Sequence, residues 1–263
     1  MNAPVSAPEL SIVIPAYNEE GRLGRGLSRI REYFVGRSVP PGVAPEISLN
    51  QLEILIVDDG SKDGTARIAE EWAREMPCVR LISNRENRGK GYSVRHGMLE
   101  ARGRLALFTD ADLSSPIEEI EKLLAAIAAG YDIAIGSRAL DRSLISIHQS
   151  RHRELAGMVF NGLVRVITGL PFSDTQCGFK IFRRERSRII FEQQRIERFG
   201  FDPEILFLAK RHGLRIAEVP VRWAHDPATK VQVLRDSGMM FVDLLLIRWN
   251  SLLGRYPKQS GAQ

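Results

Sequence analysis

The 263-residue sequence predicts an α/β protein with a mostly parallel central sheet flanked by helices. Through residue 137, short runs rich in β-branched residues alternate with longer mixed stretches, which is the spacing of successive βαβ units. Two acidic clusters, Asp58-Asp59 and Asp110-Ala111-Asp112, each follow an apolar run that reads as a strand. Because parallel sheets bind ligands at the carboxyl ends of their strands, the clusters mark the expected functional edge.

The first half is expected to begin with an apolar strand at Leu10–Pro15. A helix should follow from Asn18, a good N-cap residue, to about Phe34, with Glu19 and Glu20 in its first turn complementing the helix dipole. Gly36–Asn50 contains three prolines and two glycines and therefore predicts a long loop. The remaining elements of this half are a strand at 52–57, a helix at 63–75, a strand at 79–83, a helix at 89–102, a strand at 104–109, a helix at 116–129 and a strand at 131–136.

The second half loses this regular alternation. Its patterns predict a helix at about 153–169, a strand at 179–182, helices at 184–192 and 202–212, and a strand at 214–221. The apolar segment 237–252 is interrupted by Asp243 and is too short to span a bilayer, so it should form an amphipathic helix. Such a helix could pack on the core, form a dimer contact or lie at a membrane interface. The resulting division is a flexible start at 1–9, one domain at 10–236 with halves at 10–137 and 138–236, the helix at 237–252 and a flexible tail at 253–263.

Composition narrows the class of protein. With 44% hydrophobic residues the chain can bury one large core, and two cysteines are too few for a disulfide framework, so a reducing cytoplasm is expected. Residues 1–9 lack the basic and apolar regions of a secretion signal, which predicts a protein that is neither exported nor membrane-spanning. The net charge of +5 suits anionic ligands or an anionic membrane surface. Nucleic-acid binding is not expected, because no basic stripe is interleaved with aromatic residues.

The second acidic cluster indicates a nucleotide-sugar site. Asp110 and Asp112 are two residues apart, so in an extended segment both side chains point the same way and can hold a divalent cation against a diphosphate. The alternative is that they cap a helix beginning near Pro116. Gly89-Lys90-Gly91 opens another predicted helix, where glycines let a phosphate approach the positive helix end and Lys90 could neutralise its charge.

Several motifs together resemble family 2 glycosyltransferases of the GT-A fold, a Rossmann-like fold of nucleotide-diphospho-sugar transferases. These motifs are Ser11–Glu20 (SIVIPAYNEE), Val57–Thr65 (VDDGSKDGT), Asn87–Gly91 (NRGKG) and Thr109–Asp112 (TDAD). Three further motifs most closely resemble the dolichyl-phosphate β-glucosyltransferases, with the dolichyl-phosphate mannose synthases as near relatives. They are Ile135–Arg138 (IGSR), Asp174–Lys180 (DTQCGFK) and Arg198–Asp202 (RFGFD).

The resemblance implies roles for individual residues in donor binding. Residues 10–137 would bind the nucleotide sugar and 138–236 the acceptor. Metal binding, by Mg²⁺ or Mn²⁺, is implied for Asp110 and Asp112, with Asp112 the direct ligand. Ser114 stands where the mannose synthases carry a Gln, so Asp174 or Gln176 could complete the metal shell. The implied donor-binding residues are Pro15, Tyr17, Glu19, Asp59, Lys90 and Asp110.

The resemblance also implies how the acceptor is bound. Arg138 would bind the acceptor phosphate, since a guanidinium can make two parallel hydrogen bonds to it, and Arg151 and Arg153 are further candidates. Asp202 is either a general base or the cap of the following helix. Gln176, Lys230 and Arg235 are candidate loop contacts, whereas His225 is expected to be structural.

The implied reaction is the inverting transfer of a hexose, favoured to be glucose from UDP-glucose, onto a dolichyl or undecaprenyl phosphate. The cation would stabilise the leaving diphosphate, and an anionic acceptor needs no strong base. Alternatives are mannose transfer from GDP-mannose, transfer to a glycan or protein hydroxyl with Asp202 as base, and nucleotide-sugar binding without catalysis. The expected location is the cytoplasmic face of the membrane, bound peripherally, and an oligomer is left open.

Overall fold

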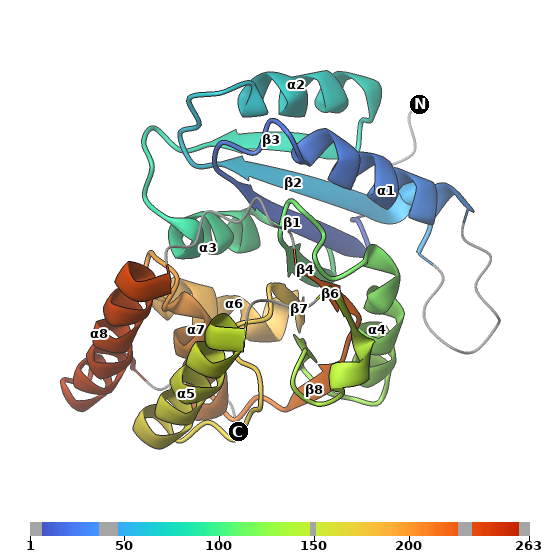
Figure 1. Ribbon diagram of the computed structural model, residues 1–263. Helices are drawn as coiled ribbons and strands as arrows, with labels where there is room; N and C mark the ends of the chain where they lie inside the picture. Colours follow the sequence, from blue (N-terminus) through green and yellow to red (C-terminus); the bar gives the residue numbers. More distant parts are fainter. Residues whose placement is uncertain (1–6, 37–46, 148–150, 226–232, 258–263) are drawn as a thin grey trace.

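The computed structural model describes residues 7–36, 47–147, 151–225 and 233–257 (Figure 1). Its centre is a seven-stranded sheet in the order β3-β2-β1-β4-β7-β5-β8. The strands are β1 (Leu10–Ala16), β2 (Leu52–Asp58), β3 (Val79–Ser83), β4 (Leu105–Thr109), β5 (Ile133–Ser137), β7 (Phe179–Arg183) and β8 (Ile216–Pro220). The mostly parallel α/β architecture predicted from the sequence is confirmed.

One strand runs against the others. β7 lies between β4 and β5 and is antiparallel to both, so that Thr109 at the end of β4 pairs with Phe179 at the start of β7. The residues that precede β7 therefore arrive at the same edge of the sheet as the residues that follow β1, β2, β4 and β5. This arrangement brings the DTQCGFK motif next to the acidic cluster after β4.

Helices cover both faces of the sheet (Figure 1). One apolar core lies beneath α1, α2 and α4, and the other lies beneath α3, α5, α6, α7 and α8. Successive side chains of a strand point to opposite faces of the sheet, and nearly all the strand side chains are apolar. Each face of the sheet therefore carries a continuous apolar core. The helices are α1 (Leu23–Gly36), α2 (Thr65–Glu75), α3 (Lys90–Glu100), α4 (Ile120–Ala128), α5 (Arg151–Thr168), α6 (Arg184–Gln193), α7 (Phe201–Arg211) and α8 (Val233–Leu252), with 3₁₀ turns at Leu49–Gln51, Ile117–Glu119 and Arg142–Leu144.

The first helix starts later than predicted. Asn18 does not cap it, because Asn18 has a positive φ of 53° and α1 begins only at Leu23. Instead, the Asn18 N–H donates to Ser61 Oγ, and its side-chain oxygen accepts from the Lys62 N–H. A second, two-stranded sheet of β6 (Ile145–Ile147) and β9 (Trp223–Ala224) was not anticipated, since strands this short carry no readable alternation.

Described residues near each end of the domain make specific contacts with it. Glu9 donates its N–H to the Gln51 carbonyl and pairs with Arg104, so the domain's contacts begin before residue 10. Near the other end, Tyr256 is fully buried and its hydroxyl donates to Glu204 Oε1 at 2.6 Å. Within the ranges described, no helix has the length and apolarity to cross a membrane.

Candidate functional site

The loops after β1 and β2 hold each other in place. Pro15 and Tyr17 are half-buried at the end of β1, and Pro15 lies beside Val57 of β2. The Glu19 N–H donates to Thr65 Oγ1 at 2.7 Å, which ties the first loop to the start of α2. The SIVIPAYNEE and VDDGSKDGT motifs thus form one surface. Hydrogen bonds between polar groups of the two motifs explain why α1 begins later in the sequence than predicted.

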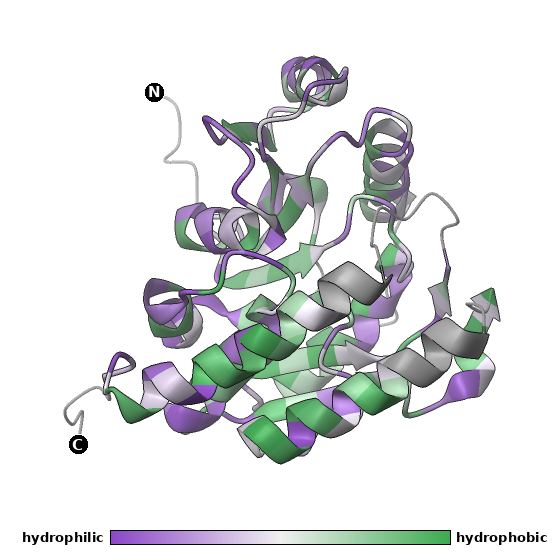
Figure 2. Ribbon diagram, turned by 60° about the vertical axis from the view of Figure 1, so that its left-hand side comes forward, coloured by the Kyte–Doolittle hydropathy of each residue, from purple (hydrophilic) through white to green (hydrophobic). Residues whose placement is uncertain are grey.

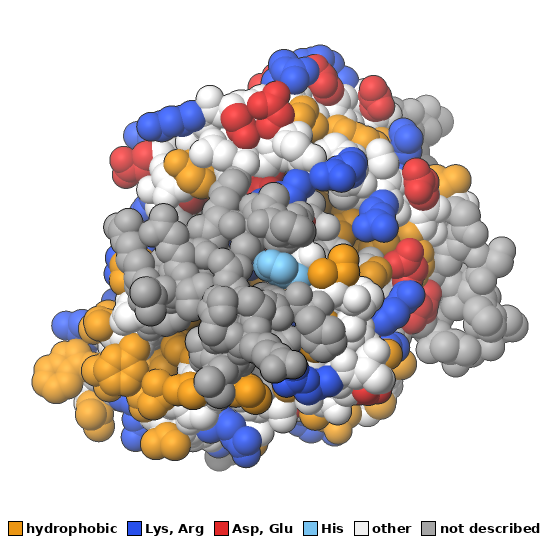
Figure 3. All heavy atoms as spheres, in the orientation of Figure 1, with side chains coloured by type: hydrophobic (Ala, Val, Ile, Leu, Met, Phe, Trp, Pro, Cys, Tyr) orange, Lys and Arg blue, Asp and Glu red, His pale blue; other side chains and the backbone are white. Residues whose placement is uncertain are grey.

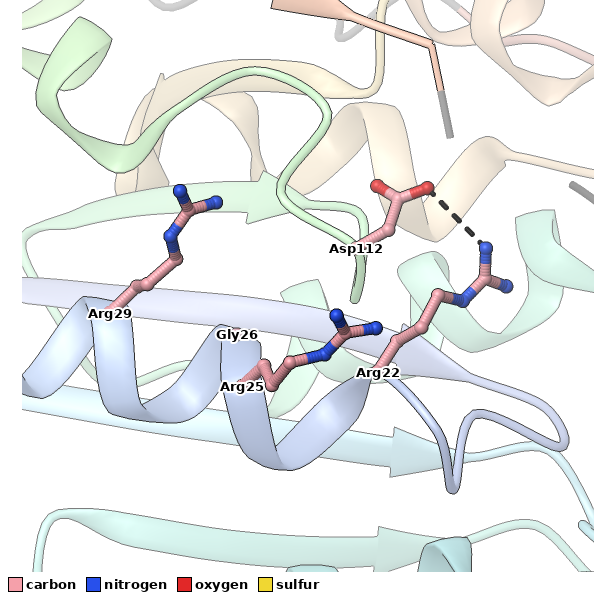
Figure 4. A pocket seen from close by; sticks show the side chains of 5 residues that line it. All are labelled: Arg22, Arg25, Gly26, Arg29 and Asp112. Atoms are coloured by element: carbon pink, nitrogen blue, oxygen red, sulfur yellow. Dashed lines mark ion pairs between the residues drawn. The ribbon is translucent and has the colours of Figure 1, made fainter. Parts of the chain in front are cut away.

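Arg22, which sequence reasoning missed, connects two predicted site residues. Its guanidinium makes two hydrogen bonds to the Glu19 carboxylate, at 2.7 and 2.8 Å, and lies 3.7 Å from Asp112 Oδ2. Figure 4 shows Arg22, just before α1, and Arg25 and Arg29 along α1, with Asp112 facing Arg22, around a pocket of about 350 Å³. The spacing of Glu19 and Arg22, three residues apart, was the available signal.

Asp59 is buried and fixes the loop that leads into α3. Its carboxylate accepts from Asn84 Nδ2 at 2.8 Å and from the backbone N–H groups of Arg88 and Gly89. Gly89 has a φ of 106°, and a Cβ there would lie 2.6 Å from the Glu197 carbonyl oxygen. Close packing against this neighbouring loop therefore accounts for the glycine, and Asp59 positions the backbone from which Lys90 projects.

The acidic cluster after β4 is a turn and not the extended segment that was expected. The Leu113 N–H donates to the Asp110 carbonyl, and Leu113 has a φ of 48°. Lys90 Nζ lies 2.5 Å from Asp110 Oδ1, and Asp112 accepts from the Ser114 N–H. Burial raises the pKa of Asp112, and the adjacent charge of Asp110 adds to that rise. The alternative that these carboxylates cap a helix is wrong, since the 3₁₀ turn after Pro116 has no side-chain cap.

The Lys90 amine is held in its charged form. Burial by itself would lower the pKa of Lys90, but the negative charges of Asp110, Asp202 and Asp112 outweigh that effect, and the pKa is raised. Lys90 therefore remains a cation across the neutral range, with carboxylates from β4 and α7 near it.

Asp202 pairs with a lysine that was not predicted. Lys180, the second residue of β7, is fully buried and lies 2.5 Å from Asp202 Oδ1, with a second bond to the Cys177 carbonyl. The prediction that Asp202 caps the helix is wrong, because the N-cap of α7 is Gly200 and Asp202 lies in the first turn. Burial raises the pKa of Asp202 although Lys180 opposes the rise. A lysine inside an otherwise apolar strand was the available signal.

Arg138 is fixed by Asp174. Its Nε and Nη2 lie 2.6 and 2.8 Å from the two carboxylate oxygens, and its backbone N–H adds a third bond. Burial would raise the pKa of Asp174, but Arg138 lowers it to about 2. Asp174 is thus committed to Arg138, which argues against its expected part in a metal shell. Gln176 lies beside the pair, and its Nε2 is buried without a hydrogen-bond partner.

Gly178 allows the DTQCGFK motif to approach the acidic turn. A Cβ added there would overlap the Asp110 carboxylate. His225 is structural as expected, since its N–H donates to the Ile147 carbonyl and its ring stacks on Trp223. Lys230 and the side chains of Arg151, Arg153 and Arg235 lie outside the described residues.

The described part of the chain contains no group of three or more acidic, histidine or cysteine side chains that could hold a metal ion. What the edge does contain is two carboxylates on one turn, a lysine beside them and a fixed arginine on the far side. Acidic side chains at the carboxyl ends of a mostly parallel sheet are the arrangement expected of a nucleotide-sugar transferase with the GT-A fold.

Comparisons with known proteins place the chain within that class. Residues 11–189 match the model of Glycosyl transferase family 2. The dolichyl-phosphate β-glucosyltransferase of Saccharomyces cerevisiae is 37% identical over 268 residues, covering 94% of this chain and 76% of that protein. The human enzyme of the same name is 35% identical, covering 94% and 77%. Glucosyl-3-phosphoglycerate synthase from Mycobacterium tuberculosis, solved with Mn²⁺, UDP and glucosyl-3-phosphoglycerate, shares the fold at a TM-score of 0.63 and 18% identity, covering 97% and 82%.

The chain therefore belongs to glycosyltransferase family 2 and is a glycosyltransferase. The resemblance of its later motifs to the dolichyl-phosphate β-glucosyltransferases is confirmed, since relatives with that name match nearly its whole length.

Proposed function

We propose that the protein transfers glucose from UDP-glucose to a polyprenyl phosphate and inverts the anomeric centre to give a β-linked product. The names of its relatives support glucose as the sugar and a dolichyl phosphate as the acceptor, and UDP is the nucleotide with which the synthase of the same fold was solved. The observation that carries the choice of acceptor is the buried contact of Asp202 with Lys180. A carboxylate already paired in this way is poorly placed to take a proton from a hydroxyl, whereas a phosphate acceptor is anionic without a base.

The donor is proposed to bind across the ends of β1, β2 and β4, in contact with Pro15, Tyr17, Glu19 and Asp59. The residues fit a divalent cation, Mg²⁺ or Mn²⁺, because hard cations of this kind commonly take one or two carboxylates and complete their shell with substrate phosphates. Asp110 and Asp112 would hold it, and it would stabilise the charge of the leaving diphosphate. The synthase that shares this fold was solved with Mn²⁺ and UDP.

Arg138 is proposed to bind the acceptor phosphate. Asp174 occupies one edge of the guanidinium, and 28% of the Arg138 side chain is exposed. Because Asp174 is buried and fixed, it orients the guanidinium and limits the entropy lost on binding. Arg151, Arg153, Gln176, Lys230 and Arg235 remain candidates for further contacts.

The test is label transfer into the organic phase from UDP-glucose and GDP-mannose in parallel, with a polyprenyl phosphate as acceptor and with or without EDTA. We expect EDTA-sensitive transfer from UDP-glucose. Asp112→Ala should abolish it, whereas Asp202→Asn should retain part of it. If Asp202→Asn is as inactive as Asp112→Ala although both variants fold, a hydroxyl acceptor becomes the better explanation. Transfer from GDP-mannose alone would reassign the donor.

A polyprenyl acceptor lies in a bilayer, and we propose that the apolar outer face of α5 and α8 contacts it on the cytoplasmic side. The two helices pack together, and both are largely apolar (Figure 2). Leu244 and Ile247 of α8 are buried in the core, yet apolar side chains also gather on the outer face of this region (Figure 3). The exposed apolar residues are Met158, Val159, Leu163 and Val166 of α5 and Phe241, Val242, Leu245, Leu246, Trp249 and Leu252 of α8.

Ten exposed apolar side chains on two packed helices are unusual on a protein that meets only water, and the exposed Arg165 and Arg248 on the same helices suit anionic headgroups. We expect the protein to sediment with liposomes containing anionic phospholipid at low salt. Trp249→Ser should reduce the bound fraction, whereas Val35→Ser, an exposed valine on α1, should not. Complete recovery in the supernatant would contradict the proposal and leave self-association as the use of this face.

A further inference from the structure

Each carboxylate of the predicted metal site already has a basic partner from the same chain. Lys90 Nζ lies 2.5 Å from Asp110 Oδ1, and Arg22 Nη1 lies 3.7 Å from Asp112 Oδ2. Both basic side chains are well covered, with exposed fractions of 22% for Lys90 and 12% for Arg22. Arg22 also holds Glu19 through two shorter hydrogen bonds, at 2.7 and 2.8 Å, so Asp110 has a counter-ion of its own whereas Asp112 shares one with Glu19.

A divalent cation that entered this site alone would gain little. It would have to displace Lys90 from Asp110, and it would be repelled by both basic groups at close range. No third acidic, histidine or cysteine ligand accompanies the pair within the described residues. A nucleoside diphosphate changes this balance, because its phosphate oxygens can complete the cation's shell and also accept hydrogen bonds from the displaced lysine.

We propose that Lys90 is an exchangeable counter-ion, which holds Asp110 in the ligand-free enzyme and moves to the diphosphate when the cation takes the carboxylates. The inference rests on the proposed function, because it assumes that a cation and a nucleoside diphosphate meet here. Its consequence is positive coupling, in which the diphosphate raises the affinity for the cation and the cation raises the affinity for the diphosphate by the same factor.

Neighbouring residues support an exchange at Lys90. Its backbone is fixed by the bonds of Asp59 to the Arg88 and Gly89 N–H groups, so only the side chain needs to move. Asp202 is also near the Lys90 amine, but its carboxylate is bonded to Lys180 and does not replace Asp110 as a direct partner.

The experiment measures Mn²⁺ binding by electron paramagnetic resonance, and UDP binding by calorimetry, without any acceptor or turnover. For the wild-type protein we expect UDP to raise the Mn²⁺ affinity at least tenfold. Lys90→Met removes a charge-assisted hydrogen bond that competes with the cation, so it should bind Mn²⁺ alone about tenfold more tightly and show weaker coupling to UDP. Lys90→Arg keeps the charge and should behave like the wild type.

Lys122→Met is the matched control, since Lys122 pairs with Glu119 at 2.7 Å away from the acidic turn and should leave Mn²⁺ binding unchanged. If Lys90→Met does not fold, Lys90→Gln removes the same charge with a polar side chain and provides the same test. If the folded variants bind UDP and their Mn²⁺ affinity is unchanged, the counter-ion exchange is overturned but the proposed function is not. Failure of the wild-type protein to bind UDP would overturn the proposed function as well.

Discussion

Substitution of Lys180 by Met should destabilise the protein strongly and in a pH-dependent way. The substitution leaves Asp202, which is 2% exposed, without the amine 2.5 Å away. Breaking a buried ion pair by removing one partner costs about 3–5 kcal/mol. The free-energy cost of protonating Asp202 gives a similar estimate, because an unpaired buried carboxylate loses its charge by taking up a proton. From an ordinary pKa of 3.8, protonation at pH 7 costs about 4 kcal/mol at about 1.4 kcal/mol per pH unit.

The sign of the pH dependence follows from the same proton. In the variant, the pKa of Asp202 is higher in the folded than in the unfolded protein, so the folded state retains a proton that the unfolded chain releases. The deficit relative to wild type should therefore shrink as the pH falls, to about 2 kcal/mol at pH 5. Urea unfolding at several pH values measures it, and the double variant Lys180→Met/Asp202→Asn should lose the dependence. A loss of unfolding free energy below about 1 kcal/mol at pH 7 would refute the reasoning, since exposed ion pairs contribute that little. A loss that stays constant down to pH 5 would also refute it.

Two further predictions concern close contacts. Gly178→Ala should lower glucosyl transfer by about a hundredfold with little loss of stability, because its new Cβ displaces the Asp110 carboxylate. The control is Gly157→Ala, where a Cβ meets nothing within 4 Å. Equal activity of the two variants would count against the contact between residue 178 and Asp110. Tyr256→Phe should lower the free energy of unfolding by about 1–3 kcal/mol, because Glu204 loses a buried donor; an unchanged urea midpoint would show that the hydroxyl does not matter.

The sequence predicted most of the sheet, because its strands are buried on both faces and are therefore nearly continuous apolar runs. β1, β2 and β4 were placed within a residue or two of their observed bounds. The predictions were wrong where a residue type that commonly has a local role makes long-range contacts instead. Asn18 has the composition of a helix cap, but its polar groups bond to Ser61 and Lys62, which lie more than 40 residues away. Tyr256 follows a helix end with no pattern that indicates burial.

The order of the motifs alone determined the family, the fold and which carboxylates lie at the ligand-binding edge, because these depend on local strand patterns and on short words of fixed spacing. Only the tertiary structure decided the partners. Lys90 meets Asp110, Arg138 meets Asp174 and Lys180 meets Asp202 through contacts between segments at least 20 residues apart. For Asp174 and Lys180 the physical reason is that β7 enters the sheet antiparallel, which brings its first residues to the ends of β4 and β5. Lys90 meets Asp110 because the start of α3 and the turn after β4 lie at the same edge of the sheet. These neighbours are properties of the assembled sheet.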